Sequence, residues 1–240
     1  MKTIVIIQAR MGSSRLSGKI LKPLGEVDVL TYVTSRCRKI QGVSEVIVAT
    51  SLLRQDDAVE QWCVENGIAC FRGSEEDVLD RYVQCAKQYE PDYVMRVTSD
   101  CPFVDYEMAN DIVAIMERER VDIVDVVGEM PRGLAVELIS YKALLFIHEN
   151  GQEPRHREHV TYYAYEYREQ FQRAVYDVPV NRLYPELRIT LDTEEDYALC
   201  QAVASHFNNS LVSNSDVIQY LVEHPEVAKL NTHIEQKPVI

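Results

Sequence analysis

The stretch of sequence that decides the fold covers residues 3–19 and reads Thr-Ile-Val-Ile-Ile-Gln-Ala-Arg-Met-Gly-Ser-Ser-Arg-Leu-Ser-Gly-Lys. Its first part, residues 3–8, is an apolar run typical of a buried strand. The loop that follows concentrates three cations, Arg10, Arg15 and Lys19, among glycines and serines. Small residues let backbone N–H groups approach an anion, and Arg and Lys supply charge and donors for phosphate oxygens. The pattern predicts a phosphate-binding loop directly after the first strand.

Two well-known phosphate loops do not match this stretch. The Walker loop has four residues between its glycines and a hydroxyl residue after its lysine. Here five residues separate Gly12 from Gly18, and Ile20 follows Lys19. The dinucleotide pattern Gly-x-Gly-x-x-Gly is absent from the sequence. The alternative, a solvated surface loop, leaves the concentration of cations in an acidic protein unexplained, so we expect a phosphate loop of another kind.

Outward from the loop, apolar runs alternate with amphipathic segments up to residue 127. We expect strands at residues 3–8, 45–50, 69–72, 93–98 and 122–127. We expect helices at residues 30–39, 56–66, 78–89 and 106–120, with Gly67 ending the second of them. Strands separated by helices predict an α/β fold with a mostly parallel sheet covered on both faces. Ligands of such sheets bind beyond the carboxyl ends of the strands.

The alternation changes after residue 128. We expect further strands at residues 134–140, 174–178 and 187–191, and helices at residues 141–150, 158–167, 194–208 and 215–224. No repeat and no linker rich in Gly, Ser or Pro divides the sequence. We therefore interpret residues 1–240 as one domain. It comprises a nucleotide-binding core at 1–128, a small inserted or appended lobe for the acceptor and dimerisation at 129–186, and a closing strand and helices at 187–240.

Composition excludes several classes of protein. The 240 residues include 38 acidic and 25 basic side chains, a formal charge of −13, which argues against a nucleic-acid partner. No apolar run reaches the roughly 18 residues of a membrane span, and we find no export signal. The six cysteines are scattered without a Cys-x-x-Cys pair, so neither a zinc ribbon nor a disulfide framework is expected. We expect a cytoplasmic protein.

Asp100 follows the expected strand at residues 93–98, at the edge of the sheet where the phosphate loop also emerges. Mg²⁺ prefers one or two carboxylates together with phosphate and water oxygens. An aspartate opposite a cationic loop meets that need. The alternative is a helix-capping aspartate, a role that suits Asp105 better because a helix is expected directly after it.

Asp192 is the second candidate carboxylate, at the end of the expected strand at residues 187–191. Thr193 and Asp196 have the spacing of a capping box for the next helix, which leaves Asp192 unexplained. Two carboxylates that converge on one site repel each other, so we expect a raised pKa for one of them until a metal ion binds.

Four further segments complete the pattern begun by the loop: residues 97–102 (VTSDCP), 133–137 (GLAVE), 157–161 (REHVT) and 187–193 (LRITLDT). With them, most of the chain resembles the cytidylyltransferases that activate acidic sugars. It is closest to the branch named for spore-coat polysaccharide biosynthesis, and more distantly similar to CMP-Kdo and CMP-sialate synthetases. The family's loop has the form A-R-x-x-S-x-R-L-P-G-K, and Ser17 stands at its proline. Ser99, Ala135 and Glu194 also replace the family's usual Gly, Asp and Pro.

The resemblance implies a fold and an activity. The fold is a Rossmann-like sheet of the nucleotide-diphospho-sugar transferase type, and related synthetases are homodimers. The activity is transfer of CMP from CTP to an acidic sugar with release of pyrophosphate, for surface polysaccharide or glycoconjugate biosynthesis. It implies that Arg10, Arg15 and Lys19 hold the triphosphate and stabilise the departing pyrophosphate, and that Asp100 and Asp192 bind Mg²⁺. Nucleotide-binding positions are expected at Gln8, Ala9, Gly12, Ser13, Ser14 and Thr98.

The acceptor site is less defined by the sequence. Residues 153–161 (EPRHREHVT) place Arg157 and His159 in a cationic cluster that fits a sugar carboxylate equally well as a solvated helix start. A zinc site is not expected, because the His-Glu-x-x-His spacing is missing. Arg132 and Glu137 flank the segment GLAVEL and are candidates for contacts with acceptor hydroxyls. The sequence does not identify the sugar, and cytosine selectivity rests on the resemblance.

Two alternatives remain from other classes. A metal-dependent glycosyltransferase of the related fold usually binds its metal through Asp-x-Asp, which is absent from this sequence. A non-catalytic nucleotide-binding protein would be expected to lose part of its metal site, whereas both Asp100 and Asp192 are present. We expect core or dimer packing, rather than base stacking, for the tyrosines at residues 162–167.

Overall fold

The computed structural model describes residues 1–13 and 15–235 of the chain. Within these residues the central sheet has seven strands in the order β5-β4-β1-β6-β8-β7-β9. The bounds are β1 Thr3–Gln8, β4 Val43–Ser51, β5 Ala69–Gly73, β6 Tyr93–Thr98, β7 Ile123–Val127, β8 Glu137–Ser140 and β9 Arg173–Asp177. Strand β8 is antiparallel to β6 and β7, whereas the remaining neighbours pair in parallel. The prediction of a mostly parallel α/β sheet is confirmed.

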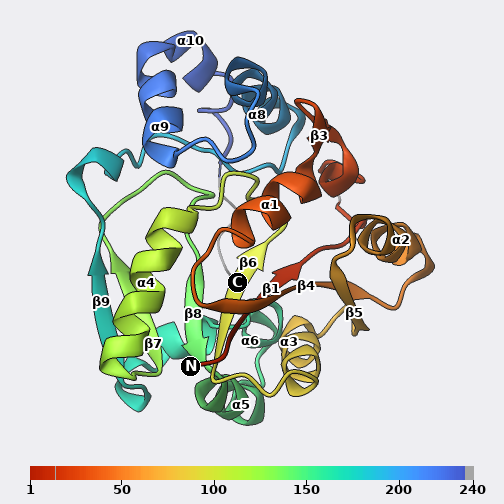
Figure 1. Ribbon diagram of the computed structural model, residues 1–240, viewed down its shortest axis with the longest axis vertical. Coiled ribbons are helices and arrows are strands. Elements are labelled where there is room, and N and C mark those ends of the chain that lie inside the picture. Colours follow the sequence, from red (N-terminus) through yellow and green to blue (C-terminus); the bar gives the residue numbers. More distant parts are fainter. Residues whose placement is uncertain (14, 236–240) are drawn as a thin grey trace.

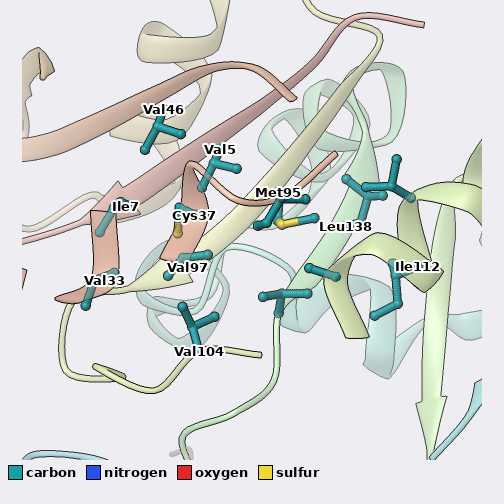
Figure 2. Close-up of a cluster of buried hydrophobic side chains, with 14 of the residues drawn as sticks. Val5, Ile7, Val33, Cys37, Val46, Met95, Val97, Val104, Ile112 and Leu138 are labelled. Carbon is teal, nitrogen blue, oxygen red and sulfur yellow. The ribbon is translucent and has the colours of Figure 1, made fainter. Parts of the chain in front are cut away.

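Helices cover both faces of this sheet (Figure 1). Side chains of α1 (Val29–Cys37), α2 (Asp57–Asn66) and α4 (Tyr106–Glu119) pack on one face. Those of α3 (Val78–Lys87), α5 (Tyr141–Asn150) and α7 (Tyr162–Glu166) pack on the other. The period of two along a strand explains the division, since Val5 and Ile7 join the first core and Ile4 and Ile6 the second. Figure 2 shows the first core, where valines of the sheet meet Val33 and Cys37 of α1 and Ile112 of α4.

A third core lies above the carboxyl end of β1, at the top of Figure 1. It contains side chains of α8 (Glu194–Phe207), of α9 (Asn214–Glu223) and of a short hairpin formed by β2 (Pro23–Leu24) and β3 (Val27–Asp28). The short helix α10 (Pro225–Ala228) follows α9 in sequence. The buried Arg36 of α1 links this part to the loop between β6 and α4, because its guanidinium donates to the carbonyls of Val104, Ser210 and Val212. The remaining elements are α6 (Pro154–Glu158) and the 3-10 turns η1 (Lys19–Leu21), η2 (Arg54–Asp56), η3 (Arg168–Gln170) and η4 (Val180–Arg182).

Up to residue 127, the predicted strands and helices match the structure to within two residues at each end, and Gly67 ends α2 with a positive φ of 60°. Later predictions need correction. The helix expected at 158–167 is shorter. Glu158 is the last residue of α6, the backbone leaves the helical region at His159 (φ −108°, ψ 49°), and α7 covers only Tyr162–Glu166. The strand expected at 134–140 begins only at Glu137, and the β2–β3 hairpin was not predicted.

The strand expected at residues 187–191 is also wrong. This segment makes one isolated bridge, between Arg188 and Arg132, and otherwise bonds to loops: Ile189 donates to Arg132 and Leu191 donates to Asp100. Its apolar residues are buried in the third core, which produced the strand-like pattern. Gly133 (φ +98°) allows the close approach, because a Cβ there would lie 2.7 Å from the Ile189 carbonyl oxygen.

Residues 137–140 and 173–177 add strands to the same sheet as the first 128 residues, so the predicted second lobe shares the central sheet. Among the described residues no helix is both long enough and apolar enough to cross a membrane.

Candidate active site

The loop after β1 is folded back on itself at the carboxyl end of the sheet. The backbone N–H groups of Ser13 and Gly18 both donate to the Met11 carbonyl, at 2.9 and 3.2 Å. The Met11 N–H donates to the buried carboxylate of Asp56 at 2.7 Å, and Ser13 Oγ accepts from Leu16 at 3.3 Å. Gly18 adopts the left-handed conformation (φ +64°) directly before η1. These bonds fix the direction in which Lys19 leaves the backbone.

The predicted nucleotide-binding positions line the start of this loop. Gln8 and Thr98 are register partners at the ends of β1 and β6. The Gln8 side-chain oxygen is buried without a partner among the described residues, so it is a free acceptor. The Ala9 N–H already donates to the Ala49 carbonyl at 3.1 Å, which leaves Ala9 only its carbonyl for a ligand. Gly12 is exposed, and Ser14 lies outside the described residues.

Asp100 and Asp192 meet at one ammonium group. Lys19 Nζ lies 3.1 Å from Asp100 Oδ2 and 2.9 Å from Asp192 Oδ1. The Arg15 guanidinium also contacts Asp192 Oδ1, at 2.9 Å. The Asp100 carbonyl accepts from the Leu191 N–H (2.8 Å) and the Thr190 hydroxyl (3.1 Å), which fastens the two aspartate-bearing segments together. The structure therefore brings together four of the predicted catalytic and metal-binding residues.

The electrostatics of this cluster differ from the expected repulsion. Burial raises the pKa of Asp100, but the charge of Lys19 and a hydrogen bond from Thr98 outweigh it and hold the pKa below its usual value. Burial lowers the pKa of Lys19, and the charges of Asp100 and Asp192 more than compensate, so the pKa is raised. The expected increase in a carboxylate pKa is thus wrong for Asp100, because Lys19 separates it from Asp192.

The second carboxylate oxygen of Asp192 is contacted by a residue whose role the sequence did not predict. Arg188 contacts Asp192 Oδ2 at 3.0 Å and Asp196 Oδ1 at 2.9 Å. Asn231 donates to Asp196 at 2.7 Å and to the Arg188 carbonyl at 3.0 Å. The capping box of Thr193 and Asp196 is confirmed. Asp196 therefore serves both the helix cap and Arg188, and the spacing of the capping box signalled only the first role.

Arg10 takes a different direction from the other two loop cations. Its guanidinium pairs with Glu75 Oε1 at 3.0 Å, and its side chain is 45% exposed. Glu75 lies between β5 and α3, so Arg10 spans the opposite side of the loop from Asp100 and Asp192.

Two of the acceptor candidates lie together on the α3–α7 side of the sheet. Glu137 forms an ion pair with Arg96 of β6 and accepts from the Thr161 hydroxyl at 2.8 Å. His159 is partly buried. Burial lowers its pKa and the nearby charge of Arg96 adds to the decrease, although Glu158 opposes it. Arg96 was not predicted, since its position inside an apolar strand hid its pairing with β8.

The other two acceptor candidates are directed elsewhere. Arg157 Nε donates to Asp77 at 2.8 Å, and its Nη1 donates to the His148 carbonyl. Arg132 is exposed, with its backbone engaged by the segment at 187–191. The solvated helix start weighed for residues 153–161 does not describe His156, which is 2% exposed and lies 2.5 Å from Glu166. That segment therefore contributes to packing as well as to the polar surface.

Comparison with known proteins assigns the chain to a family. Residues 4–223 match the cytidylyltransferase family. The chain belongs to the cytidylyltransferase family. This cytidylyltransferase is 33% identical to the spore coat polysaccharide biosynthesis protein SpsF of Bacillus subtilis, over 94% of this chain and 96% of SpsF.

Solved structures agree with this assignment. A cytidylyltransferase from Leptospira borgpetersenii superposes with a TM-score of 0.90 at 30% identity, covering 99% of this chain and 100% of the other. A CMP:2-keto-3-deoxy-manno-octonic acid synthetase solved with CTP superposes with a TM-score of 0.67 at 17% identity, covering 86% of this chain and 100% of that one, which shows the shared fold. The resemblance seen in the sequence is confirmed, and the chain is a CTP-dependent nucleotidyltransferase by family.

Proposed function

We propose that this cytidylyltransferase transfers CMP from CTP to an acidic sugar, with release of pyrophosphate, in the biosynthesis of a surface polysaccharide. The observation that carries the proposal is the meeting of Arg15 and Lys19 with Asp100 and Asp192 at one point of the sheet edge. The relationship to SpsF supports the polysaccharide context, and the CMP-sugar synthetase of shared fold supports an acidic acceptor. Mg²⁺ as cofactor and a cytoplasmic location belong to the same proposal.

The reaction needs no protein nucleophile. The sugar hydroxyl attacks the α-phosphorus, the bond to the β-phosphate breaks, and pyrophosphate leaves. Arg15 and Lys19 hold the triphosphate and neutralise the charge that develops on the departing pyrophosphate. Arg10 would leave Glu75 and bind the phosphates from the other side of the loop. Gln8, Ala9, Gly12, Ser13, Ser14 and Thr98 provide the remaining contacts to the nucleotide. Catalysis is then positioning together with charge neutralisation.

Asp100 and Asp192 fit a hard divalent cation. Their carboxylate oxygens both lie within 3.1 Å of a single cationic nitrogen, so they converge on one position. No cluster of three or more His, Cys, Asp or Glu side chains suited to a metal occurs in the described ranges, 1–13 and 15–235. Two carboxylates are the number that Mg²⁺ uses when phosphate and water complete its shell. A bound Mg²⁺ would polarise the α-phosphate and lower the pKa of the attacking hydroxyl.

We assign the acceptor to the α3–α7 side, because Glu137 and His159 lie near Arg96 there. Glu137 is suited to accept from sugar hydroxyls, and Arg96 keeps a buried Nε without a partner among the described residues. Arg132 and Arg157 are assigned to the acceptor carboxylate, for which Arg157 would exchange its contact with Asp77. The division of the single domain into residues 1–128, 129–186 and 187–240, with the middle segment for acceptor binding and homodimerisation, completes the proposal.

A pyrophosphate-release assay with the four nucleoside triphosphates tests the proposal. The purified chain is incubated with each nucleotide and Mg²⁺, with and without a panel of acidic sugars. We expect release only with CTP and an acidic sugar, and none from the Asp100→Asn variant. Pyrophosphate release with a neutral sugar, and not with an acidic one, would show that the acceptor is a neutral sugar. Turnover of a CMP-sugar without consumption of CTP would favour the metal-dependent glycosyltransferase. CTP binding without any turnover would favour the non-catalytic nucleotide-binding protein.

A further inference from the structure

The carboxylate of Asp192 has cations on both of its oxygens. Lys19 Nζ and Arg15 Nη2 each lie 2.9 Å from Oδ1, and Arg188 lies 3.0 Å from Oδ2. The same Lys19 nitrogen is 3.1 Å from Asp100 Oδ2, and Lys19 is only 8% exposed. The position between the two carboxylates, where a metal ion would bind both, is therefore the position of the Lys19 ammonium.

The charges of this cluster balance. Among the described residues Lys19, Arg15 and Arg188 pair with three carboxylates, those of Asp100, Asp192 and Asp196. A divalent cation that approaches this arrangement meets a buried ammonium of like charge instead of two open carboxylates. The cluster thus attracts a bare metal ion far less than two aspartates would.

The cations of the cluster are not equally fixed. Arg188 is anchored by contacts with Asp196 from both Nε and Nη2, at 2.9 and 3.1 Å. Lys19 has a flexible four-carbon side chain with three rotatable donors, so it exchanges partners readily. Arg15 is 30% exposed along its side chain and emerges from the loop beside Lys19. The two cations able to leave Asp192 are therefore the two that the proposed function assigns to the triphosphate.

We propose that Lys19 keeps the metal position closed until a triphosphate draws it away, so that divalent metal and nucleotide enter this site together. The inference rests on the proposed function, which supplies both the triphosphate and the assignment of Asp100 and Asp192 to the metal. When Lys19 and Arg15 move to the phosphates, Asp100 loses its cation and Asp192 Oδ1 loses both of its cations, so these carboxylate oxygens become available to the metal. Arg188 remains in contact with Asp192 and preserves its orientation.

The test is metal binding without nucleotide. Mn²⁺ binding to the wild-type chain, to Lys19→Met and to Lys22→Met is measured by calorimetry and by the spectroscopic signal of free Mn²⁺. Lys22 is the matched control, because it lies three positions further on and pairs with Glu194 at 3.7 Å instead of the two aspartates. We expect Lys19→Met to bind Mn²⁺ at least about tenfold more tightly than the wild type, a typical size for coupling between two sites. Lys22→Met should bind like the wild type.

A second substitution separates the mechanism from a general charge effect. Asp100→Asn in the Lys19→Met background should abolish the added affinity. Arg15→Met should raise Mn²⁺ affinity by a smaller factor and provides the answer if Lys19→Met does not fold. Mn²⁺ affinity of Lys19→Met equal to that of the wild type, or an equal gain in Lys22→Met, would overturn the proposal. Because these measurements contain no nucleotide, a failed pyrophosphate-release assay would leave their outcome unchanged.

Discussion

At the scale of single residues, the cations of the loop are paired with carboxylates that lie far away in the sequence. Lys19 is buried between two carboxylates, although the sequence placed it in a loop that we expected to be exposed. Arg10 is paired with Glu75, away from the other cations of the same loop. A sequence motif specifies which residues are near the phosphates, but the partners of each cation depend on segments far along the chain.

Replacing Lys19 or Arg15 by alanine is expected to reduce kcat/KM for CTP. Each change removes charge-assisted hydrogen bonds worth about 1.5–3 kcal/mol, which corresponds to about 10–150-fold in rate. Initial rates at subsaturating CTP measure the effect, and near-native circular dichroism shows that the fold is retained. Wild-type rates in both variants would contradict the assignment of the phosphate loop.

Asp125 gives a prediction for the dependence of stability on pH. Burial raises its pKa, but the hydrogen bonds and charges of Arg173 and Arg168 outweigh this and hold the pKa below its usual value. A lowered pKa in the folded state means that the stabilisation is present above the unfolded value of about 3.9 and is lost as the pH falls through the folded value. Asp125 is 5% exposed, so Asp125→Asn should cost about 3 kcal/mol at pH 7.

Urea unfolding of the wild type and Asp125→Asn across pH 2–7 measures this difference, which should narrow below about pH 4 as Asp125 is protonated. A difference that stayed constant down to pH 2 would show that packing, rather than charge, stabilises this part of the sheet.

At the scale of elements, local sequence patterns predicted which segments are helices and strands, and long-range contacts determine where each strand lies in the sheet. The alternation of apolar residues predicted β1, β4, β6 and their intervening helices almost residue by residue. It could not predict that β8 lies between β6 and β7, because that order depends on which strands pair across the sheet. The segment at 187–191 has a strand's pattern because the third core buries it, yet its backbone bonds go to loops.

The close approach between Gly133 and the segment at 187–191 gives a prediction at this scale. In Gly133→Ala, the new Cβ would lie 2.7 Å from backbone atoms of Ile189 and Thr190. We expect a loss of about 3 kcal/mol from strain and overlap, and a lower activity because Asp192 directly follows this segment. Gly67→Ala is the control: its φ is also positive (+60°), but nothing lies within 4 Å of its Cβ, so it should lose only about 1 kcal/mol.

Thermal unfolding distinguishes the two glycine variants, since about 1 kcal/mol shifts the Tm of a chain of this size by about 2–4 °C. Equal shifts in Tm for Gly133→Ala and Gly67→Ala would show that the contact with residues 187–191 is not tight.

At the scale of the whole molecule, three cores meet at the site. The loop after β1 ends in the third core through Leu16, Asp100 follows a strand shared by the first two cores, and Asp192 follows the buried segment of the third. Asn231, near the end of the described chain, reaches back to Asp196 and Arg188. The sequence could identify Asp100 and Asp192 from their places after apolar runs. It could not identify Asn231, because no local pattern links it to them.

The oligomeric state depends on which apolar surfaces the folded chain leaves exposed. We expected a dimer because related synthetases are homodimers. We also reasoned that residues 134–139 and the tyrosines at 162–167 leave a second lobe with little core of its own. That reason is wrong, since Leu134 (0% exposed), Leu138 (0%) and Tyr163 (8%) are buried within the chain. A different surface supports the same expectation. Strand β9 is an edge of the sheet, and Val175 (53% exposed) lies on the same face as its diagonal neighbour Val127 (50%).

An exposed strand edge with apolar side chains is a template for pairing with another chain, and a second copy of β9 paired along this edge would lie beside Val175. We expect light scattering at micromolar concentration to give twice the 27.6 kDa mass of one chain. Val175→Lys should shift the mass to that of a single chain, because a charge on an edge strand opposes pairing. Val222→Lys, at a valine that is also 50% exposed but lies on α9, should leave the dimer intact. A single-chain mass for the wild type would exclude the homodimer, and a dimer that survives Val175→Lys would place the interface elsewhere.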